Sequence, residues 1–150
     1  MAPEIRAYRD DDFSAVAALE CGTGGSKYQA AVFIRQAAVL FNDQFLVLEQ
    51  DRRAVGFTIG ARVQGNGEEA WVLRLKVEEG LRGNGFGRQL LEALLGRFCE
   101  SGASGAVLTV SPSNTPARRL YESAGFGVVG EEPGYFGDGE DRLVMRLPLR

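Results

Sequence analysis

The sequence predicts one domain of the mixed α/β (α+β) class over residues 1–150, and three observations carry that prediction. Segments with strand alternation and segments with helical spacing follow one another in the order β-α-α-β-β-β-α-β-α-β-β. Short turns join several consecutive strands, as in antiparallel pairs. One strand-helix-strand unit in the middle predicts a single parallel pair. We therefore expect a mostly antiparallel sheet of about seven strands with one central parallel pair.

Five segments before residue 65 have strand or helix periodicity. They are a strand over 5–9, a helix over 10–20, a helix over 28–40, and strands over 45–49 and 55–59. Asp10, Asp11 and Asp12 offer N-cap oxygens for the first helix. The tight turn at 51–53 makes the two later strands an antiparallel pair. Gly65-Asn66-Gly67 predicts a second hairpin turn.

The second half continues with two strand-helix units and a closing pair of strands. The elements are a strand with Trp71, Leu73, Leu75 and Val77 on one face, a helix with an apolar stripe over 86–98, a strand over 106–110, a helix over 115–124, and strands over 126–130 and 142–149. Gly102 ends the first of these helices. Thr115 and Pro116 resemble the N-cap and first turn of the second, and Gly125 ends it.

Charge and composition exclude several classes of function. A net charge of −3 and a pI near 5.1 argue against nucleic-acid binding, which needs clustered Lys and Arg. Neither a secretory signal nor a run of ~18 apolar residues is present, so we expect a cytoplasmic protein without a membrane partner. The chain has no His, which excludes Cys/His zinc sites and His-dependent catalysis, and we expect no metal. Cys21 and Cys99 are expected to be small buried hydrophobes.

The segment LRGNGFGRQLL (81–91) has three glycines between an apolar strand and an apolar helix. A glycine turn before a helix N-terminus binds anions, because unpaired N–H groups and the helix dipole meet there. Phe86-Gly87 stands where a Walker loop needs Lys-Ser/Thr, and the glycine spacing is not that of a dinucleotide fold. The alternative is a close-packed strand-to-helix turn.

Two motifs together resemble the GCN5-related N-acetyltransferase (GNAT) family. The sequence from Arg82 to Gly87 matches the family's Q/R-x-x-G-x-G pattern, after a strand ending in LKV. The sequence from Asn114 to Phe126 resembles the second motif, N-x-x-A-x-x-L-Y-x-x-x-G-F. The motifs cover 71–126, whereas 1–65 agree only in element order. The resemblance implies the GNAT fold, with helices on both faces of the sheet.

The resemblance also implies acetyl-CoA as co-substrate. The backbone of Leu75, Lys76 and Val77 would pair with the pantetheine arm. Main-chain amides of the loop would hold the pyrophosphate, and this loop comprises Arg82, Gly83, Asn84, Gly85, Phe86, Gly87 and Arg88. Asn114 would contact the pantetheine side, and Tyr121 would stand near the sulfur.

In this family the substrate amine attacks the thioester directly. A main-chain N–H near 75–77 would then stabilise the oxyanion, and Tyr121 would protonate the leaving thiolate. A thiol pKa of ~8.5 against a phenol pKa of ~10 makes this transfer feasible. The alternative is that Tyr121 only fills the apolar stripe of its helix.

The general base is not identified by the motifs. Histone-type relatives carry a glutamate where this chain has Trp71, and the bacterial ribosomal-protein alanine N-acetyltransferases carry one where it has Thr109. Glu69, on the face of Trp71, is the candidate. The alternative is that Glu68 and Glu69 form a solvated hairpin edge.

Residues 133–145 resemble the hairpin of the ribosomal-protein enzymes, which frames the acceptor peptide. Tyr135 is therefore a candidate acceptor contact, although it could instead pack under its own loop, beside a solvated acidic turn at 138–141. Glu20, at the end of the first helix, is a candidate to line the opposite wall of the acceptor site. We predict an acetyl-CoA-dependent N-acetyltransferase that acts on a primary amine, with a peptide or protein N-terminus favoured. The alternatives are a small-molecule amine acetyltransferase (polyamine, amino acid or aminoglycoside) and a non-catalytic acetyl-CoA-binding module. A homodimer is common among such relatives.

Overall fold

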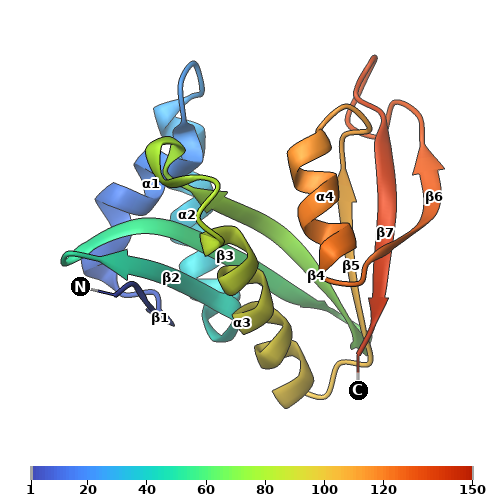
Figure 1. Cartoon of the computed structure of the whole chain (residues 1–150), viewed down its shortest axis with the longest axis horizontal. Coiled ribbons are helices and arrows are strands. Elements are labelled where there is room, and N and C mark those ends of the chain that lie inside the picture. The colour runs from blue at the N-terminus through green and yellow to red at the C-terminus, as the bar shows by residue number, and fades with distance from the viewer. Residues whose placement is uncertain (1, 150) are drawn as a thin grey trace. The chain divides into compact units, whose positions relative to one another are not determined.

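The computed structural model describes residues 2–149 and confirms the mixed α/β class (Figure 1). Seven strands form one sheet in the order β1-β2-β3-β4-β5-β7-β6, and β4 and β5 are its parallel pair. The strands are β1 (Glu4–Ala7), β2 (Phe45–Gln50), β3 (Arg53–Val63), β4 (Asn66–Val77), β5 (Gly105–Val110), β6 (Gly127–Glu132) and β7 (Arg142–Pro148). The helices are α1 (Phe13–Cys21), α2 (Lys27–Leu40), α3 (Phe86–Glu100) and α4 (Thr115–Ser123).

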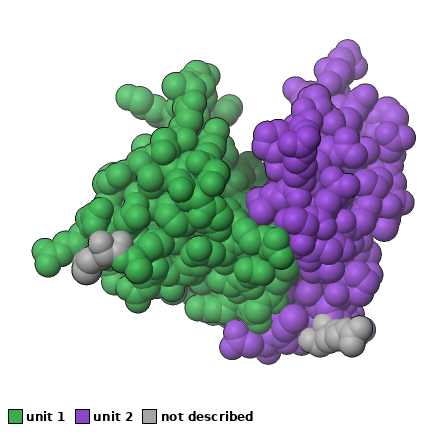
Figure 2. All heavy atoms as spheres, viewed as in Figure 1, with its two compact units in different colours: residues 1–61, 73–97 green, residues 62–72, 98–150 purple. Residues whose placement is uncertain are grey.

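The described chain contains two compact units (Figure 2). Unit 1 comprises residues up to 61 together with 73–97, and unit 2 comprises 62–72 together with 98 to the C-terminal end. The boundaries fall inside β3, β4 and α3, so each of these elements contributes to both units.

Helices cover both faces of the strands in unit 1 (Figure 1). Val16 of α1 and Ile34 of α2 are fully buried against Phe45 and Phe57 of the strands. On the opposite face, Leu90 of α3 packs in a cluster with strand residues. Burial of these side chains at ~25 cal/mol per Å² is what holds the helices on the strands. The local periodicity that predicted the helices therefore also set which side of each is buried.

A close approach between strands and α3 requires a glycine at position 56. An added Cβ there would lie 3.1 Å from the Lys76 carbonyl oxygen and 3.2 Å from Cδ1 of Leu90. A side chain there would force the Leu90 side chain or the Lys76 carbonyl to shift by a few tenths of an ångström, in an interior that is close-packed.

The predicted single apolar face of β4 is wrong. Leu73 packs against the cluster shared with α1 and α2, whereas Leu75 and Val77 pack against the cluster that contains α3. Arg74 also reaches α1, so two consecutive side chains, Leu73 and Arg74, face the same side. A strand does this where an extra residue interrupts the pleat. The buried Thr58 hydroxyl supports the interruption by donating to the Arg74 carbonyl at 2.7 Å.

Unit 2 contains β5 between β4 and β7, with β6 as the outer strand beside β7. Leu108 of β5 and Met145 of β7 are register partners and are both buried. β6 is exposed along most of its length, as expected for an edge strand. α4 runs alongside these strands (Figure 1).

Two predicted helix caps are wrong. Asp12 makes no side-chain cap for α1; its carboxylate instead accepts from both terminal nitrogens of Arg6, at 2.8 and 2.9 Å, and from the Arg9 N–H at 2.8 Å. At α4 the N-cap is Asn114 rather than Thr115, and its Oδ1 accepts from the Ala117 N–H at 3.3 Å. In both cases the sequence offers adjacent capping residues, and contacts that the sequence does not reveal decide whether any of them caps.

Candidate acetyl-transfer site

The glycine loop stands at the start of α3, within unit 1. Gly83 and Gly85 have φ values of 85° and 80°, which side chains other than glycine's rarely adopt. No atom lies within 4 Å of where a Cβ on either would stand, so the loop surface is open. Tight packing therefore does not explain the glycines of this loop, and a close-packed strand-to-helix turn is the weaker interpretation of the segment. Unpaired N–H groups of the first turn of α3 give this open surface a positive character.

Side chains around the loop brace it from one side. Arg82 donates from Nε to the Val77 carbonyl at 3.2 Å, and Asn84 donates from its amide to the Leu81 carbonyl at 2.9 Å. Phe86 packs into the buried cluster below α3. Arg88 lies 3.4 Å from Glu92 in an ion pair one helical turn along. These contacts fix the loop backbone, which suits a group that must be bound by main-chain amides.

The stretch from Leu75 to Val77 adjoins this loop in the same unit. Leu75 and Val77 are anchored by their side chains toward α3, and Lys76 reaches the other way to donate to the Glu20 carbonyl at 3.1 Å. The segment is therefore held by side chains on both of its faces. A strand segment held in this way can pair its backbone with an extended ligand, as in strand addition.

Tyr121 lies on α4 in unit 2. Its ring packs edge-on against Phe126, with centroids 5.9 Å apart. Burial raises the pKa of the Tyr121 phenol above its ordinary value, because a charged phenolate is poorly solvated there. The group therefore remains protonated at neutral pH and is able to act as an acid.

Asn114 and Glu69 also belong to unit 2. The Oδ1 atom of Asn114 caps α4, and its amide NH₂ is the part left for a ligand. Glu69 accepts from the Trp71 indole N–H at 3.2 Å and is the register partner of Gly105. Glu69 and Trp71 therefore share a face of β4, as the sequence predicts. Thr109 is partly buried on β5.

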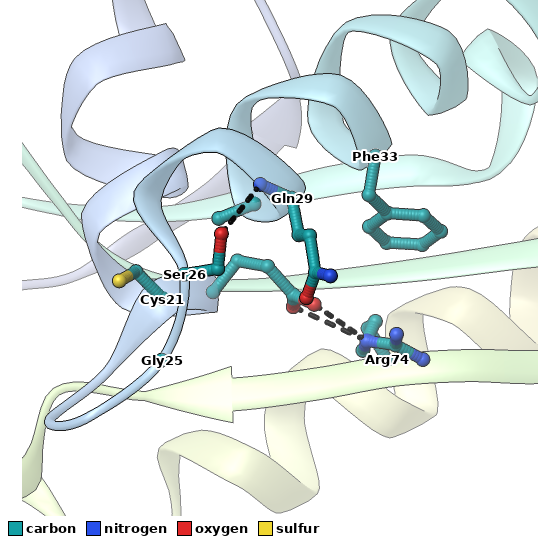
Figure 3. A pocket seen from close by; sticks show the side chains of 8 residues that line it. Cys21, Gly25, Ser26, Gln29, Phe33 and Arg74 are labelled. Atoms are coloured by element: carbon teal, nitrogen blue, oxygen red, sulfur yellow. Dashed lines mark hydrogen bonds and ion pairs between the residues drawn. The ribbon is translucent and has the colours of Figure 1, made fainter.

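Glu20 lines a pocket of about 320 Å³ in unit 1, between the α1–α2 connection and β4 (Figure 3). The Nε atom of Arg74 donates to both Glu20 carboxylate oxygens, at 2.9 and 3.2 Å. The guanidinium also lies over the Phe33 ring, 4.5 Å from its centre. Glu20 is thus held in an ion pair and is not a free carboxylate.

Tyr135 lies on the connection between β6 and β7. It is 45% exposed and contacts the exposed Phe136 ring edge-on, with centroids 4.9 Å apart. Arg142 lies over Phe136, and Asp141 accepts from the Gly134 N–H at 2.8 Å. Asp141, an acid of the 138–141 turn, thus holds the loop in shape by this hydrogen bond. The exposed aromatic pair of Tyr135 and Phe136 is available to contact an acceptor.

Sequence reasoning missed Arg74 and Phe33. Neither belongs to a motif, and Arg74 meets Glu20 across 54 residues of sequence. The Phe33 spacing on α2 is a helical signal, but it does not indicate a partner. The expected burial of both cysteines is wrong, because Cys21 is partly exposed beside the pocket and Cys99 is exposed.

Neither a metal-ion cluster nor a membrane-spanning helix is present in residues 2–149. No group of three or more Cys, Asp or Glu side chains in this range could hold a metal ion. In the same described range, no helix combines the length and apolar composition needed to cross a bilayer.

Comparison with known proteins identifies the family. The model of the "Acetyltransferase (GNAT) family" matches residues 6–126. The chain is 31% identical to the "uncharacterized N-acetyltransferase MJ1530" of Methanocaldococcus jannaschii over 94% of this chain and 88% of that protein. Its structure is similar to that of Ard1 from Thermoplasma volcanium, with a TM-score of 0.89, 25% identity, and 100% and 99% of the two chains covered.

A second similar structure is the ribosomal-protein-S18-alanine N-acetyltransferase of Escherichia coli, with a TM-score of 0.80, 26% identity, and 99% of this chain and 94% of that chain covered. The sequence match to that enzyme is 35% identical but spans only 55% of this chain and 57% of the enzyme.

The chain belongs to the GNAT family. Membership confirms the predictions of a GNAT fold and of an acetyltransferase that uses acetyl-CoA as co-substrate.

Proposed function

We propose that this enzyme acetylates the α-amine of a peptide or protein, and that residues 1–150 form one catalytic domain for this reaction. The observation that carries the proposal is that neither candidate carboxylate is fully free. Glu20 is paired with Arg74, and Glu69 accepts from Trp71. An α-amine of pKa ~8 is neutral in about one molecule in ten at pH 7, against about one in 2,500 for a lysine side chain. An α-amine therefore needs the least help from a base.

The relatives support the same acceptor class. The Escherichia coli enzyme with a similar structure is a ribosomal-protein-alanine N-acetyltransferase, so its acceptor is a protein amine. The aromatic pair at Tyr135 and the pocket at Glu20 are the surfaces that we assign to acceptor contact. We also propose a cytoplasmic location and a homodimer. Sedimentation of the pure protein measures its oligomeric state.

We assign acetyl-CoA to the loop and the strand segment of unit 1. Main-chain amides of Gly83 to Arg88 bind the pyrophosphate, and the backbone of Leu75 to Val77 pairs with the pantetheine arm. Asn114 contributes its free amide. A main-chain N–H near Leu75 to Val77 supplies the oxyanion donor. Tyr121 protonates the departing thiolate of CoA, which the raised phenol pKa allows at neutral pH.

Glu69 is assigned as the base that takes the proton of the attacking amine, directly or through water. The Trp71 N–H occupies only one carboxylate oxygen, Oε1, and leaves Oε2 to accept. Glu69→Gln should lower kcat/KM by ~100-fold, a typical contribution of general base catalysis. Glu68→Gln is the matched control on the neighbouring position. Equal activity of wild type and Glu69→Gln would remove Glu69 from the mechanism.

One assay tests the function. CoA release from acetyl-CoA is measured with short peptides that have a free α-amine, with the same peptides blocked at the N-terminus but containing lysine, with spermidine and with an aminoglycoside. The proposal expects turnover with the free α-amine peptides. Turnover with only spermidine or the aminoglycoside would show a small-molecule enzyme, and binding of acetyl-CoA without any turnover would favour the non-catalytic module.

A further inference from the structure

The charges at the Glu20 pocket do not cancel. The Glu20 side chain is only 11% exposed, and two cations meet its carboxylate: Arg74 at 2.9 Å and Lys76 at 3.9 Å. One negative charge is therefore set against two positive ones. A buried carboxylate in this position is neutralised rather than offered to a ligand. The pocket should attract an anion and not a further cation.

Arg74 retains donors that its known contacts do not use. A guanidinium carries five N–H donors. Nε is used by Glu20, and Nη1 donates to the Leu73 carbonyl at 2.9 Å. Nη2 of Arg74 donates no hydrogen bond to an acceptor within residues 2–149. The edge formed by Nη1 and Nη2 can therefore bind the two oxygens of one carboxylate side by side.

The guanidinium is also fixed in advance. Glu20 holds one edge, and the Phe33 ring lies 4.5 Å from the guanidinium carbon (Figure 3). Gln29 and Phe33 project from α2 toward Arg74 in this view. A donor held in place by packing and an ion pair loses little entropy when it binds a ligand. This makes Arg74 suited to select a ligand and not only to stabilise the fold.

The pocket adjoins the segment assigned to acetyl-CoA. Arg74 immediately precedes Leu75, and the Lys76 side chain extends to Glu20 at the pocket wall. At about 320 Å³ the pocket is at the lower end of the ~300–1,000 Å³ range of small-ligand sites. It therefore has room for one side chain of an acceptor whose amine reacts nearby.

We propose that Arg74 determines acceptor specificity by binding a carboxylate close to the reacting amine, so that the preferred acceptors are peptides with Asp or Glu as their first or second residue. The inference rests on the proposed function, because it names which α-amines the enzyme takes. Arg74 acts through the bound acceptor and has no part in the proton transfers.

Two pairs of peptides that differ only in charge test the inference. One pair has Glu or Gln as the second residue, and the other has Asp or Asn as the first. We expect kcat/KM to be at least ~10-fold higher for the acidic member of a pair, which is the weight of one charge-assisted hydrogen bond. Equal kcat/KM within both pairs, with turnover present, overturns the inference and leaves the proposed function standing. Turnover of spermidine but of no peptide overturns both.

Variants then show whether Arg74 is responsible. Arg74→Met should reduce the kcat/KM ratio of the acidic to the neutral peptide to near 1. Arg74→Lys should retain part of the preference, since lysine keeps the charge but cannot make the two parallel hydrogen bonds of a guanidinium. Arg35→Met is the matched control, because Arg35 also lies over a phenylalanine ring, that of Phe13, but does not line the pocket. The ratio within a peptide pair is independent of how much protein is folded. If Arg74→Met leaves the kcat/KM ratio within a peptide pair unchanged, the assignment of acceptor specificity to Arg74 is overturned.

Discussion

The two helices that carry the sequence motifs are held in opposite ways. α3, which follows the glycine loop, has four fully buried side chains: Leu90, Leu91, Leu94 and Phe98. α4 has no fully buried residue, and Tyr121, which it carries, is only partly buried. The glycine loop thus begins a helix that is anchored by the core, whereas Tyr121 belongs to a helix that depends on its ends and on a few partial contacts.

The ends of α4 are accordingly well defined. Asn114 caps the start, Pro116 occupies the first turn, and the chain leaves through Gly125 at a φ of 105°. At the end of the helix the Phe126 N–H donates to the Tyr121 carbonyl at 3.0 Å, next to the contact between the two rings. The difference suggests that substitutions in α3 act on the stability of the protein, and substitutions in α4 act on its chemistry.

Leu94→Ala should have the largest effect. Removing a fully buried leucine costs ~2–5 kcal/mol, from lost burial and the cavity that remains. Leu120→Ala, at a partly exposed site of α4, is the control and should cost less than half as much. Urea unfolding measures both. Equal losses in the free energy of unfolding would contradict the contrast between the two helices.

Tyr121→Phe should change chemistry without changing stability. The ring and its contact with Phe126 remain, so the melting temperature and the affinity for acetyl-CoA should remain close to those of the wild type. Loss of the phenolic proton should lower kcat ~100-fold, within the range of general acid catalysis. Steady-state kinetics and calorimetric titration with acetyl-CoA give the two values. Unchanged turnover would exclude Tyr121 as the acid.

The pH dependence of stability checks the same residue. Because burial raises the folded-state pKa of Tyr121, the folded protein binds more protons than the unfolded chain at alkaline pH. The contribution of Tyr121 is complete below the ordinary tyrosine pKa of ~10 and declines as the pH rises through the folded-state value. Wild type should therefore lose more stability than Tyr121→Phe above pH ~10. Parallel pH profiles would mean that the phenol ionises equally in both states.

The sequence was informative where the signal is local. The apolar stripe of α3 and the turn at Gly102 repeat at fixed short spacings, so the helix could be predicted with its buried face. The interrupted pleat at Leu73–Arg74 depends on how β4 meets other elements, and no local pattern records it. The pairing of Arg74 with Glu20 joins residues 54 positions apart, so one sequence cannot reveal it.

Gly85→Ala should weaken acetyl-CoA binding by about tenfold. A φ of 80° costs a residue with a Cβ ~1–2 kcal/mol, so the loop would relax away from the shape that binds the pyrophosphate. Gly80→Ala is the matched control, since Gly80 precedes the same loop, does not have a left-handed φ, and has open space around an added Cβ. Calorimetric titration measures both dissociation constants. Equal weakening by the two variants would mean that the loop conformation is not what binds the co-substrate.

Asn114→Ala should have the smallest effect on stability, and that effect should be confined to α4. Loss of an N-cap costs ~1 kcal/mol, and with no buried side chain the helix has little else to hold its first turn. Hydrogen exchange of the α4 amides should quicken while that of the α3 amides stays the same, because α3 is anchored by the core. Asn114→Ser retains a capping oxygen but lacks the amide, so it separates the two roles assigned to this residue. Weaker acetyl-CoA binding in the serine variant, with α4 still protected, would assign Asn114 to the ligand as well as to the helix.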